Sequence, residues 1–179
     1  MKLEGLTVNF LGDSITEGTG VINIPENRYD NRLKRMYNLG ATNNYGIGGT
    51  RLAHQEKPSD KPRYDLCFCG RAYNMDPNAD LIVVYGGVND YIHGDAYFGK
   101  MEDRTPETFC GAVYFLMELL TGSVAKYIFS AFFTSLRSFA RTSPFPRIVI
   151  YFGSKSPSTS MPSVLFGKSR TCPFDANTS

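Results

Sequence analysis

Residues 9–18, Asn-Phe-Leu-Gly-Asp-Ser-Ile-Thr-Glu-Gly, form an apolar run that stops at a glycine and is followed by a carboxylate and a hydroxyl. Apolar and polar residues alternate from residue 6 onward, which predicts a half-buried strand of about six residues. Gly12 permits a tight turn, so Ser14 is expected where the strand gives way to a helix or loop. Backbone N–H groups there face outward, which makes Ser14 a candidate nucleophile beside its own oxyanion donor. A second interpretation is that Asp13 and Ser14 only cap the next element.

Two later stretches repeat this pattern of an apolar strand, a glycine and a small polar residue. Residues 44–49 read Asn-Tyr-Gly-Ile-Gly-Gly, and residues 81–90 read Leu-Ile-Val-Val-Tyr-Gly-Gly-Val-Asn-Asp. Open parallel α/β sheets place their chemistry beyond the carboxyl ends of the strands, so we expect the three stretches to meet at one edge. Residues 46–49 could instead form a plain turn, and Asn89 with Asp90 a helix cap.

Together, and in this order, the three stretches resemble those of the SGNH, or GDSL-type, hydrolases. The resemblance implies an α/β fold, a three-layer α/β/α sandwich with a small parallel, flavodoxin-like sheet, and hydrolysis of carboxylic esters. It makes Ser14 the nucleophile, Gly49 a backbone N–H donor and Asn89 a side-chain N–H donor to the oxyanion, and it places Asp13 in the pocket. A tetrahedral intermediate needs such preorganised donors. The implied partner is a small-molecule ester, with no cofactor and no metal ion.

The remaining pattern also favours a sheet covered by helices. Residues 81–85 have no polar interruption, which is typical of a strand buried on both faces. Helices are predicted from residue 29 to a Gly40 cap, over 64–75, and from a Thr105 cap to residue 120. Their predicted buried stripes are Tyr29, Leu33, Met36 and Tyr37 in the first helix, and Val113, Leu116, Met117 and Leu120 in the third. Residues 19–25 and 51–61 are predicted loops.

Composition narrows the possible function classes. The chain has 179 residues, is 42% hydrophobic and carries a net charge of +2, so it can bury a full core, and nothing in it suggests a nucleic-acid partner. Residues 1–5 have no leader pattern, which predicts a cytoplasmic location, and no apolar run approaches the roughly 18 residues of a membrane span. The four cysteines are predicted to be reduced, and Cys67-Phe68-Cys69 has the wrong spacing for a zinc site. The oligomeric state has no sequence signal.

The chain has two histidines, and neither stands where the family places its base. SGNH hydrolases carry a late Asp-x-x-His whose histidine takes the serine proton. Asp90-Tyr-Ile-His93 spells those letters, but Asn89 already occupies this strand end. We therefore expect His93 to line the pocket, with a role as substitute base as the alternative. His54 lies in a predicted loop and is expected to be exposed.

The composition changes after Gly122. Residues 1–122 hold 16 acidic residues, 12 basic residues and 2 serines. Residues 123–179 hold 1 acidic residue, 7 basic residues and 12 serines. Residues 126–133 and 147–152 could still be strands, but Asp175 is the only late carboxylate, and Asn177 and Thr178 stand where a histidine is expected. We predict an SGNH core over 1–122 and an atypical segment over 123–179, interpreted as out-of-frame translation. A basic, disordered tail that binds an acidic partner is the alternative.

The sequence thus predicts an ester hydrolase impaired by loss of its histidine. A non-catalytic module that binds an acylated or carbohydrate ligand in the same pocket is the alternative, and its binding would survive Ser14→Ala. A phosphate-binding role for residues 46–49 is disfavoured because the lysine and spacing of a phosphate loop are missing.

Overall fold

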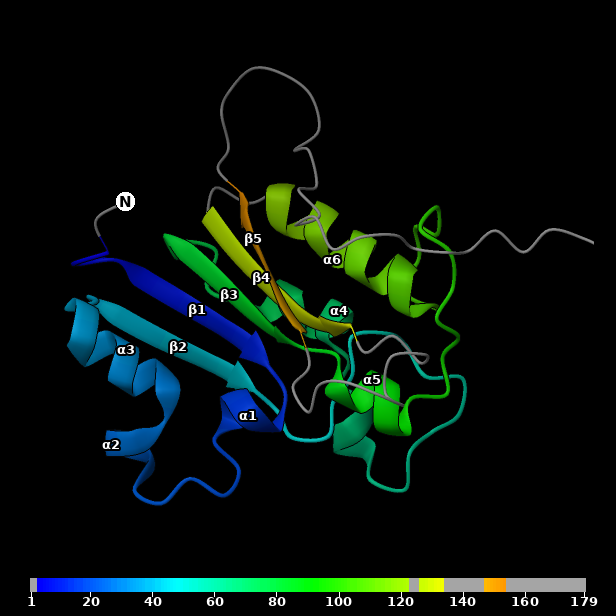
Figure 1. Cartoon of the computed structure of the whole chain (residues 1–179), viewed down its shortest axis with the longest axis horizontal. Coiled ribbons are helices and arrows are strands. Elements are labelled where there is room, and N and C mark those ends of the chain that lie inside the picture. The colour runs from blue at the N-terminus through cyan, green and yellow to red at the C-terminus, as the bar shows by residue number, and fades with distance from the viewer. Residues whose placement is uncertain (1–2, 123–125, 134–146, 154–179) are drawn as a thin grey trace, which may run out of the picture.

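A five-stranded sheet forms the centre of the molecule. The computed structural model describes residues 3–122, 126–133 and 147–153. The strands are β1 (Thr7–Gly12), β2 (Ala41–Gly46), β3 (Leu81–Gly86), β4 (Lys126–Phe133) and β5 (Arg147–Gly153). Their order is β2-β1-β3-β4-β5 (Figure 1), and β1 to β4 are parallel while β5 pairs antiparallel with β4. All five strands that the sequence suggests are present.

Both faces of the sheet are buried, because successive residues of a strand point to opposite sides. Leu11 of β1 and its register partner Val84 of β3 pack in one hydrophobic cluster, together with Leu116. Phe10, the preceding residue of β1, packs in a second cluster against Leu33. The three-layer α/β/α architecture is therefore confirmed.

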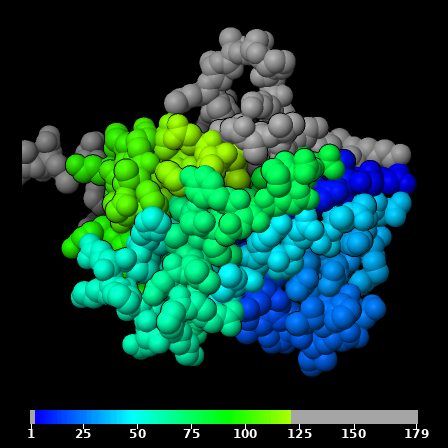
Figure 2. All heavy atoms as spheres, turned by 180° about the vertical axis from the view of Figure 1, so that it is seen from behind, coloured from blue at the N-terminus to red at the C-terminus, as the bar shows by residue number. Residues whose placement is uncertain are grey.

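Helices form the outer layers. The helix from residue 29 packs on the face that holds Phe10, and the one from residue 109 packs on the face that holds Leu11. Seen from behind, blue segments up to about residue 45 occupy one side of the molecule and turquoise and green segments the other (Figure 2). The helices are α1 (Ser14–Glu17), α2 (Ile24–Asn27), α3 (Tyr29–Tyr37), η1 (Pro62–Asp65), α4 (Phe68–Arg71), η2 (Ala72–Asn74), α5 (Val88–His93) and α6 (Phe109–Gly122), where η marks a 3₁₀ helix.

The helix predicted over residues 64–75 is wrong as a continuous element. Cys67 has extended backbone angles, φ −60° and ψ 160°, so the chain breaks there into η1, α4 and η2. The break is stabilised because the Phe68 amide donates to the Arg51 carbonyl at 2.9 Å and the Gly70 amide donates to Cys67 Sγ at 3.4 Å. A long-range backbone bond therefore outweighs local helix propensity here.

The ends of the two longer helices also differ from prediction. Helix α3 ends at Tyr37, and its C-cap is Asn38, which adopts the left-handed conformation (φ 52°), in place of the predicted Gly40. Helix α6 begins at Phe109, because Thr108 Oγ1 accepts from the Gly111 amide at 3.1 Å and supplies the cap predicted for Thr105.

The predicted buried stripes hold only in part. In α6, Leu116 and Leu120 are buried, with Val113 and Met117 packed against them. In α3, Tyr29 and Leu33 pack on the sheet, but Met36 and Tyr37 are exposed. The predicted loop over residues 19–25 runs into the start of α2, whereas residues 51–61 are a loop as expected.

The predictions for the last part of the chain are not tested by the described residues. Asp175, Asn177 and Thr178 are not among the described residues. The domain boundary at residue 122 stays a prediction. Within the described part of the chain, no helix is long and apolar enough to cross a membrane.

Candidate active site

The turn after β1 places Ser14 at the first position of α1. Asp13 caps this helix: its Oδ1 accepts from the Ile15 amide at 3.0 Å. Gly12 is required for the turn, because a Cβ there would lie 1.9 Å from Thr16 Oγ1 and 2.9 Å from the Tyr85 carbonyl oxygen. The Ser14 amide is at a helix start, where backbone donors have no partner within the helix.

Asp13 is almost completely buried, with 1% of its surface exposed, and it is not among the residues that line the cavity described below. Burial raises the pKa of its carboxyl group, which the Ile15 hydrogen bond and the nearby Arg71 charge only partly offset. Within the described part of the structure its Oδ2 has no hydrogen-bond partner. Asp13 therefore caps α1 and so places Ser14 at the start of the helix, while the role of Ser14 as nucleophile stays a prediction.

The loop after β2 is packed onto α1. The Ile47 amide donates to the Gly12 carbonyl at 3.0 Å, which joins the carboxyl ends of β1 and β2. Gly49 has φ +80°, and a Cβ there would lie 2.3 Å from the Tyr64 ring, so both backbone conformation and space require glycine. Among the described residues we find no acceptor for the Gly49 amide, which leaves it able to bind a ligand oxygen.

Asn89 lies in the first turn of α5, directly after β3. Its Nδ2 donates to the Thr50 carbonyl at 2.9 Å, which fixes the side chain and leaves the second N–H of the amide for a ligand. Thr50 is itself held, because its Oγ1 donates to the Ile47 carbonyl at 2.7 Å. Asn89 and the loop that contains Gly49 are therefore joined to each other.

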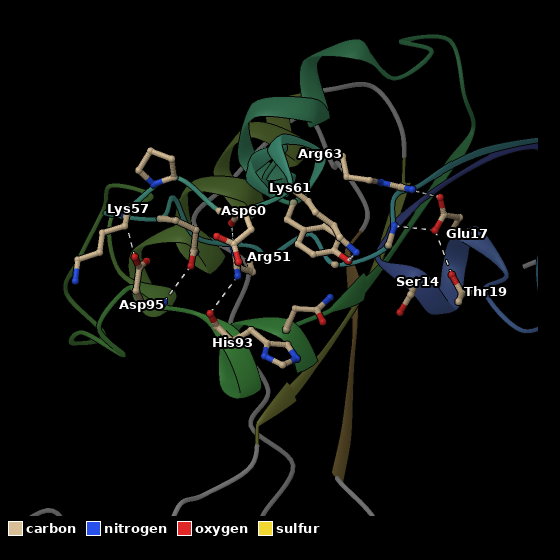
Figure 3. Close-up of a pocket in the computed structure, with 17 residues that line it drawn as sticks. Ser14, Glu17, Thr19, Arg51, Lys57, Asp60, Lys61, Arg63, His93 and Asp95 are labelled. Carbon is tan, nitrogen blue, oxygen red and sulfur yellow. Dashed lines mark hydrogen bonds and ion pairs between the residues drawn. The ribbon is translucent and has the colours of Figure 1, made fainter.

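Ser14, Gly49, Asn89 and His93 line one cavity of about 820 Å³ (Figure 3). In the close-up, Ser14 and Glu17 lie at one end of this cavity, and Lys57 and Asp95 at the other. The lining carries side chains of both signs of charge. The remaining lining residues are Thr19, Gly48, Arg51, Gln55, Pro58, Ser59, Asp60, Lys61, Arg63 and Tyr64.

Arg71 is a buried residue that holds the strand ends around the site, and the sequence analysis did not identify it. It is 8% exposed and donates to the Gly12 carbonyl at 3.1 Å, to Thr50 Oγ1 at 2.9 Å, and to the carbonyls of Tyr45 and Leu66. Burial lowers its pKa to about 10. The available signal was an arginine among the apolar residues of a short segment, where a buried charge needs several partners.

Asp90 and His93 do not form a catalytic pair in the described structure. Both oxygens of Asp90 accept from the Leu52 amide at 2.9 and 3.0 Å, and Oδ1 also accepts from the Ala53 amide at 3.0 Å. Burial raises the pKa of Asp90, although the hydrogen bonds from the Leu52 and Ala53 amides act to lower it. The His93 side chain is exposed, and its backbone carbonyl accepts from Arg51 at 3.1 Å. Asp90 thus holds the loop after Thr50 and does not orient an imidazole.

The other residues considered for chemistry lie elsewhere. His54 is exposed, with its Nδ1 at 3.7 Å from a Glu107 oxygen. Cys67, Cys69 and Cys110 are free and buried, and burial raises the pKa of each thiol. The described residues contain no group of three or more side chains placed to hold a metal ion.

Comparison with known proteins shows which family the chain matches and which solved structures it resembles. Residues 10–163 match the GDSL-like lipase/acylhydrolase family. One solved structure is 28% identical with a TM-score of 0.60, covering 72% of this chain and 57% of its own. Another, from Lactobacillus plantarum, is 27% identical with a TM-score of 0.57, covering 70% and 55%. This chain thus spans little more than half the length of these two structures.

A third solved structure, from Bacteroides uniformis and named as a GDSL-like lipase, is 19% identical with a TM-score of 0.53. The alignment covers 69% of this chain and 70% of that one. At this identity the likeness shows the fold alone. A search of curated proteins found no significant match.

Proposed function

Because the chain belongs to the GDSL-like lipase/acylhydrolase family, we propose that it carries a serine esterase site in which Ser14 attacks an acyl carbonyl. The Ser14 and Gly49 amides and the Asn89 side chain bind the resulting oxyanion. One observation carries this proposal: the three residues follow the carboxyl ends of adjacent parallel strands and line a single cavity. Parallel α/β sheets bind ligands at this edge.

The proposed chemistry needs two parts, and we propose that the described residues supply the first of them. Donors held before the reaction stabilise the tetrahedral intermediate, and loss of one donor typically costs about a hundredfold or more in rate. The second part is a base that takes the Ser14 proton and later returns it to the leaving alcohol. Two observations support the proposal that this base is missing: Asp90 is bonded to backbone amides, and the exposed His93 has no orienting carboxylate among the described residues.

We therefore propose that these 179 residues form an oxyanion pocket with little turnover. A serine and its base act as a unit, and loss of the base costs about 10⁶-fold in the best-studied protease. The cavity lining favours a short acyl group and a polar alcohol. Its described lining residues include no leucine, isoleucine, valine, methionine or phenylalanine, and Tyr64 is the aromatic residue among them.

A non-catalytic binding module is the second candidate, and the engagement of Asp90 by the Leu52 and Ala53 amides favours it. In that case the same donors hold the carbonyl or carboxylate of an acylated or carbohydrate ligand. The two candidates differ in their dependence on Ser14, because hydrolysis requires the hydroxyl and binding does not.

The deciding experiment is hydrolysis of a short-chain nitrophenyl ester, together with labelling by a fluorophosphonate probe and mass spectrometry of the adduct. We expect turnover near background and little or no adduct in folded protein. Brisk hydrolysis that disappears in Ser14→Ala, with an adduct on Ser14, would show that the chain has a working base and would overturn the proposed impairment. An adduct on Ser59, which also lines the cavity, would overturn the assignment of the nucleophile.

A further inference from the structure

Glu17 connects the nucleophile helix to the loop that carries Gly49. It is the last residue of α1, three positions after Ser14. Its Oε2 accepts from the Gly48 amide at 2.9 Å and from Thr19 Oγ1 at 3.2 Å, and its Oε1 accepts from Arg63 of η1 (Figure 3). The carboxylate thus joins α1, the loop after β2 and η1 at the end of the cavity near Ser14.

The peptide between Gly48 and Gly49 needs such a restraint. Two adjacent glycines are the most flexible backbone a chain can have, so the direction of the Gly49 N–H is not set by local sterics. From the other side the loop is anchored at Thr50, which Arg71 and Asn89 hold. The Glu17 bond to the Gly48 amide supplies the anchor on the near side.

The contact is built closely. A Cβ at Gly48 would lie 2.6 Å from Glu17 Oε2 and 3.5 Å from Ser14 Cβ, so glycine is what allows the carboxylate to reach the amide. A Cβ at Gly46 would lie 2.2 Å from the Glu17 amide nitrogen. Two glycines of this loop are therefore explained by the approach of Glu17, whereas Gly49 is explained by its own φ and by Tyr64.

Glu17 is a poor candidate for the missing base. Partial burial acts to raise its pKa, but hydrogen bonds from Arg63, the Gly48 amide and Thr19 outweigh burial and hold the pKa below its usual value. Arg63 is the charged group that the described structure places against it. A carboxylate whose lone pairs are occupied and whose pKa is depressed stabilises its donors and does not accept the proton of a serine.

We propose that Glu17, held by Arg63, is a positioning residue that anchors the Gly48 amide and thereby limits the orientations of the following peptide, so that the Gly49 amide can bind an oxyanion. The inference rests on the proposed function in one respect, that the Gly49 amide binds an oxyanion. The restraint of the Gly48 amide by Glu17 does not depend on the proposed function. Its test must therefore read the backbone directly and not depend on turnover.

The experiment is amide NMR of the full chain as wild type, Glu17→Gln and Glu17→Ala, with Glu26→Ala as the control. Glu26 forms an exposed ion pair with Arg35 at 3.7 Å in the α2–α3 region, so this variant removes a similar charge pair away from the cavity. In Glu17→Ala we expect the Gly48 and Gly49 resonances to move and Gly48 hydrogen exchange to accelerate at least about tenfold, the factor that corresponds to loss of a hydrogen bond to a charged group. Glu17→Gln keeps an oxygen acceptor and should recover part of the protection.

Two further readouts separate positioning from packing. The wild-type Gly48 amide shift should titrate with a midpoint below the usual glutamate pKa of about 4.3, and this titration should be absent in Glu17→Gln. Acetate, used as the oxyanion probe, should shift Gly49 and the Asn89 side-chain amide in the wild type and in Glu26→Ala, but not in Glu17→Ala. Unchanged Gly48 and Gly49 resonances in a folded Glu17→Ala would overturn the inference. Absence of any acetate response in the wild type would instead count against the proposed function, while the exchange data would still decide the role of Glu17.

Discussion

Asp90 offers the sharpest test of how the site is held together. Asp90→Ala removes the acceptor of the Leu52 and Ala53 amides, and both of those residues are 0% exposed. A buried donor left without a partner costs about 1–3 kcal/mol, so two cost about 2–6 kcal/mol. Burial raises the pKa of Asp90, which means that removing its charge recovers some desolvation free energy. We therefore expect the free energy of unfolding to fall by about 2–4 kcal/mol.

The chain contains a matched control for this prediction. Asp95 accepts from two consecutive backbone amides in the same way, from Glu56 at 3.0 Å and from Lys57 at 2.9 Å, but this contact is exposed. Water can replace the carboxylate there, so Asp95→Ala should cost about 1 kcal/mol or less. The contrast between the two variants isolates the effect of burial, because the number of amides released is the same.

The assay is equilibrium urea unfolding followed by circular dichroism at neutral pH. For a slope of about 2 kcal/mol/M, Asp90→Ala should lower the midpoint by about 1–2 M. Asp90→Asn keeps Oδ1, which can accept from both amides, and should lose less. Equal midpoints for Asp90→Ala and Asp95→Ala, or loss of an esterase activity without loss of stability in Asp90→Asn, would refute the assignment of Asp90 as a structural anchor.

Three other predictions concern Gly49, Asp30 and His93. Gly49→Ala should lower the free energy of unfolding by at least about 1–2 kcal/mol, the cost of a left-handed residue; adding Tyr64→Ala should relieve the crowding but not this backbone cost, as urea unfolding can measure. Burial raises the pKa of Asp30, but hydrogen bonds from Arg28 outweigh it and hold the folded pKa below its usual value. The stabilisation over Asp30→Asn should therefore be present above about pH 3.9 and be lost as pH falls through the folded pKa, which unfolding at a series of pH values would detect. His93→Ala should leave fluorophosphonate labelling unchanged, whereas labelling that depends on His93 would identify it as a substitute base.

The strands and the candidate site residues at their ends could be predicted from the sequence, because both depend on local pattern. The apolar run at 81–85 needs no context to be identified as a buried strand, and β3 spans Leu81–Gly86. The glycines after β1 and β2 mark turns for a reason intrinsic to the residue. The positions of Ser14, Gly49 and Asn89 at one cavity then follow from the rule that parallel strands end at the same edge.

The hydrogen-bond partners of the site residues could not be predicted from the sequence. Arg71 lies in a segment predicted as a continuous helix, and only the long-range bond from Phe68 to Arg51 shows why that helix breaks and where Arg71 points. Asp90 spelled a catalytic motif with His93, yet its acceptors serve amides 37 and 38 residues earlier in the chain. Contacts of this separation have no periodic signature, so the sequence predicted a continuous helix around Arg71 and indicated no partner for Asp90.

These partners are also the reason why the proposed oxyanion pocket does not require the proposed base for its structure. The Thr50 carbonyl holds Asn89, Glu17 holds the Gly48 amide, and Arg71 joins the ends of β1 and β2. All of these bonds lie within residues 12–89, whereas the family's histidine is expected near the C-terminus, in a region where this sequence has none. Because oxyanion donors and base depend on separate parts of the chain, loss of the second need not disturb the first. The test is direct: acetate should shift the Gly49 and Asn89 amides even in protein that hydrolyses no ester, and absence of an acetate response in folded protein would count against the proposed oxyanion pocket.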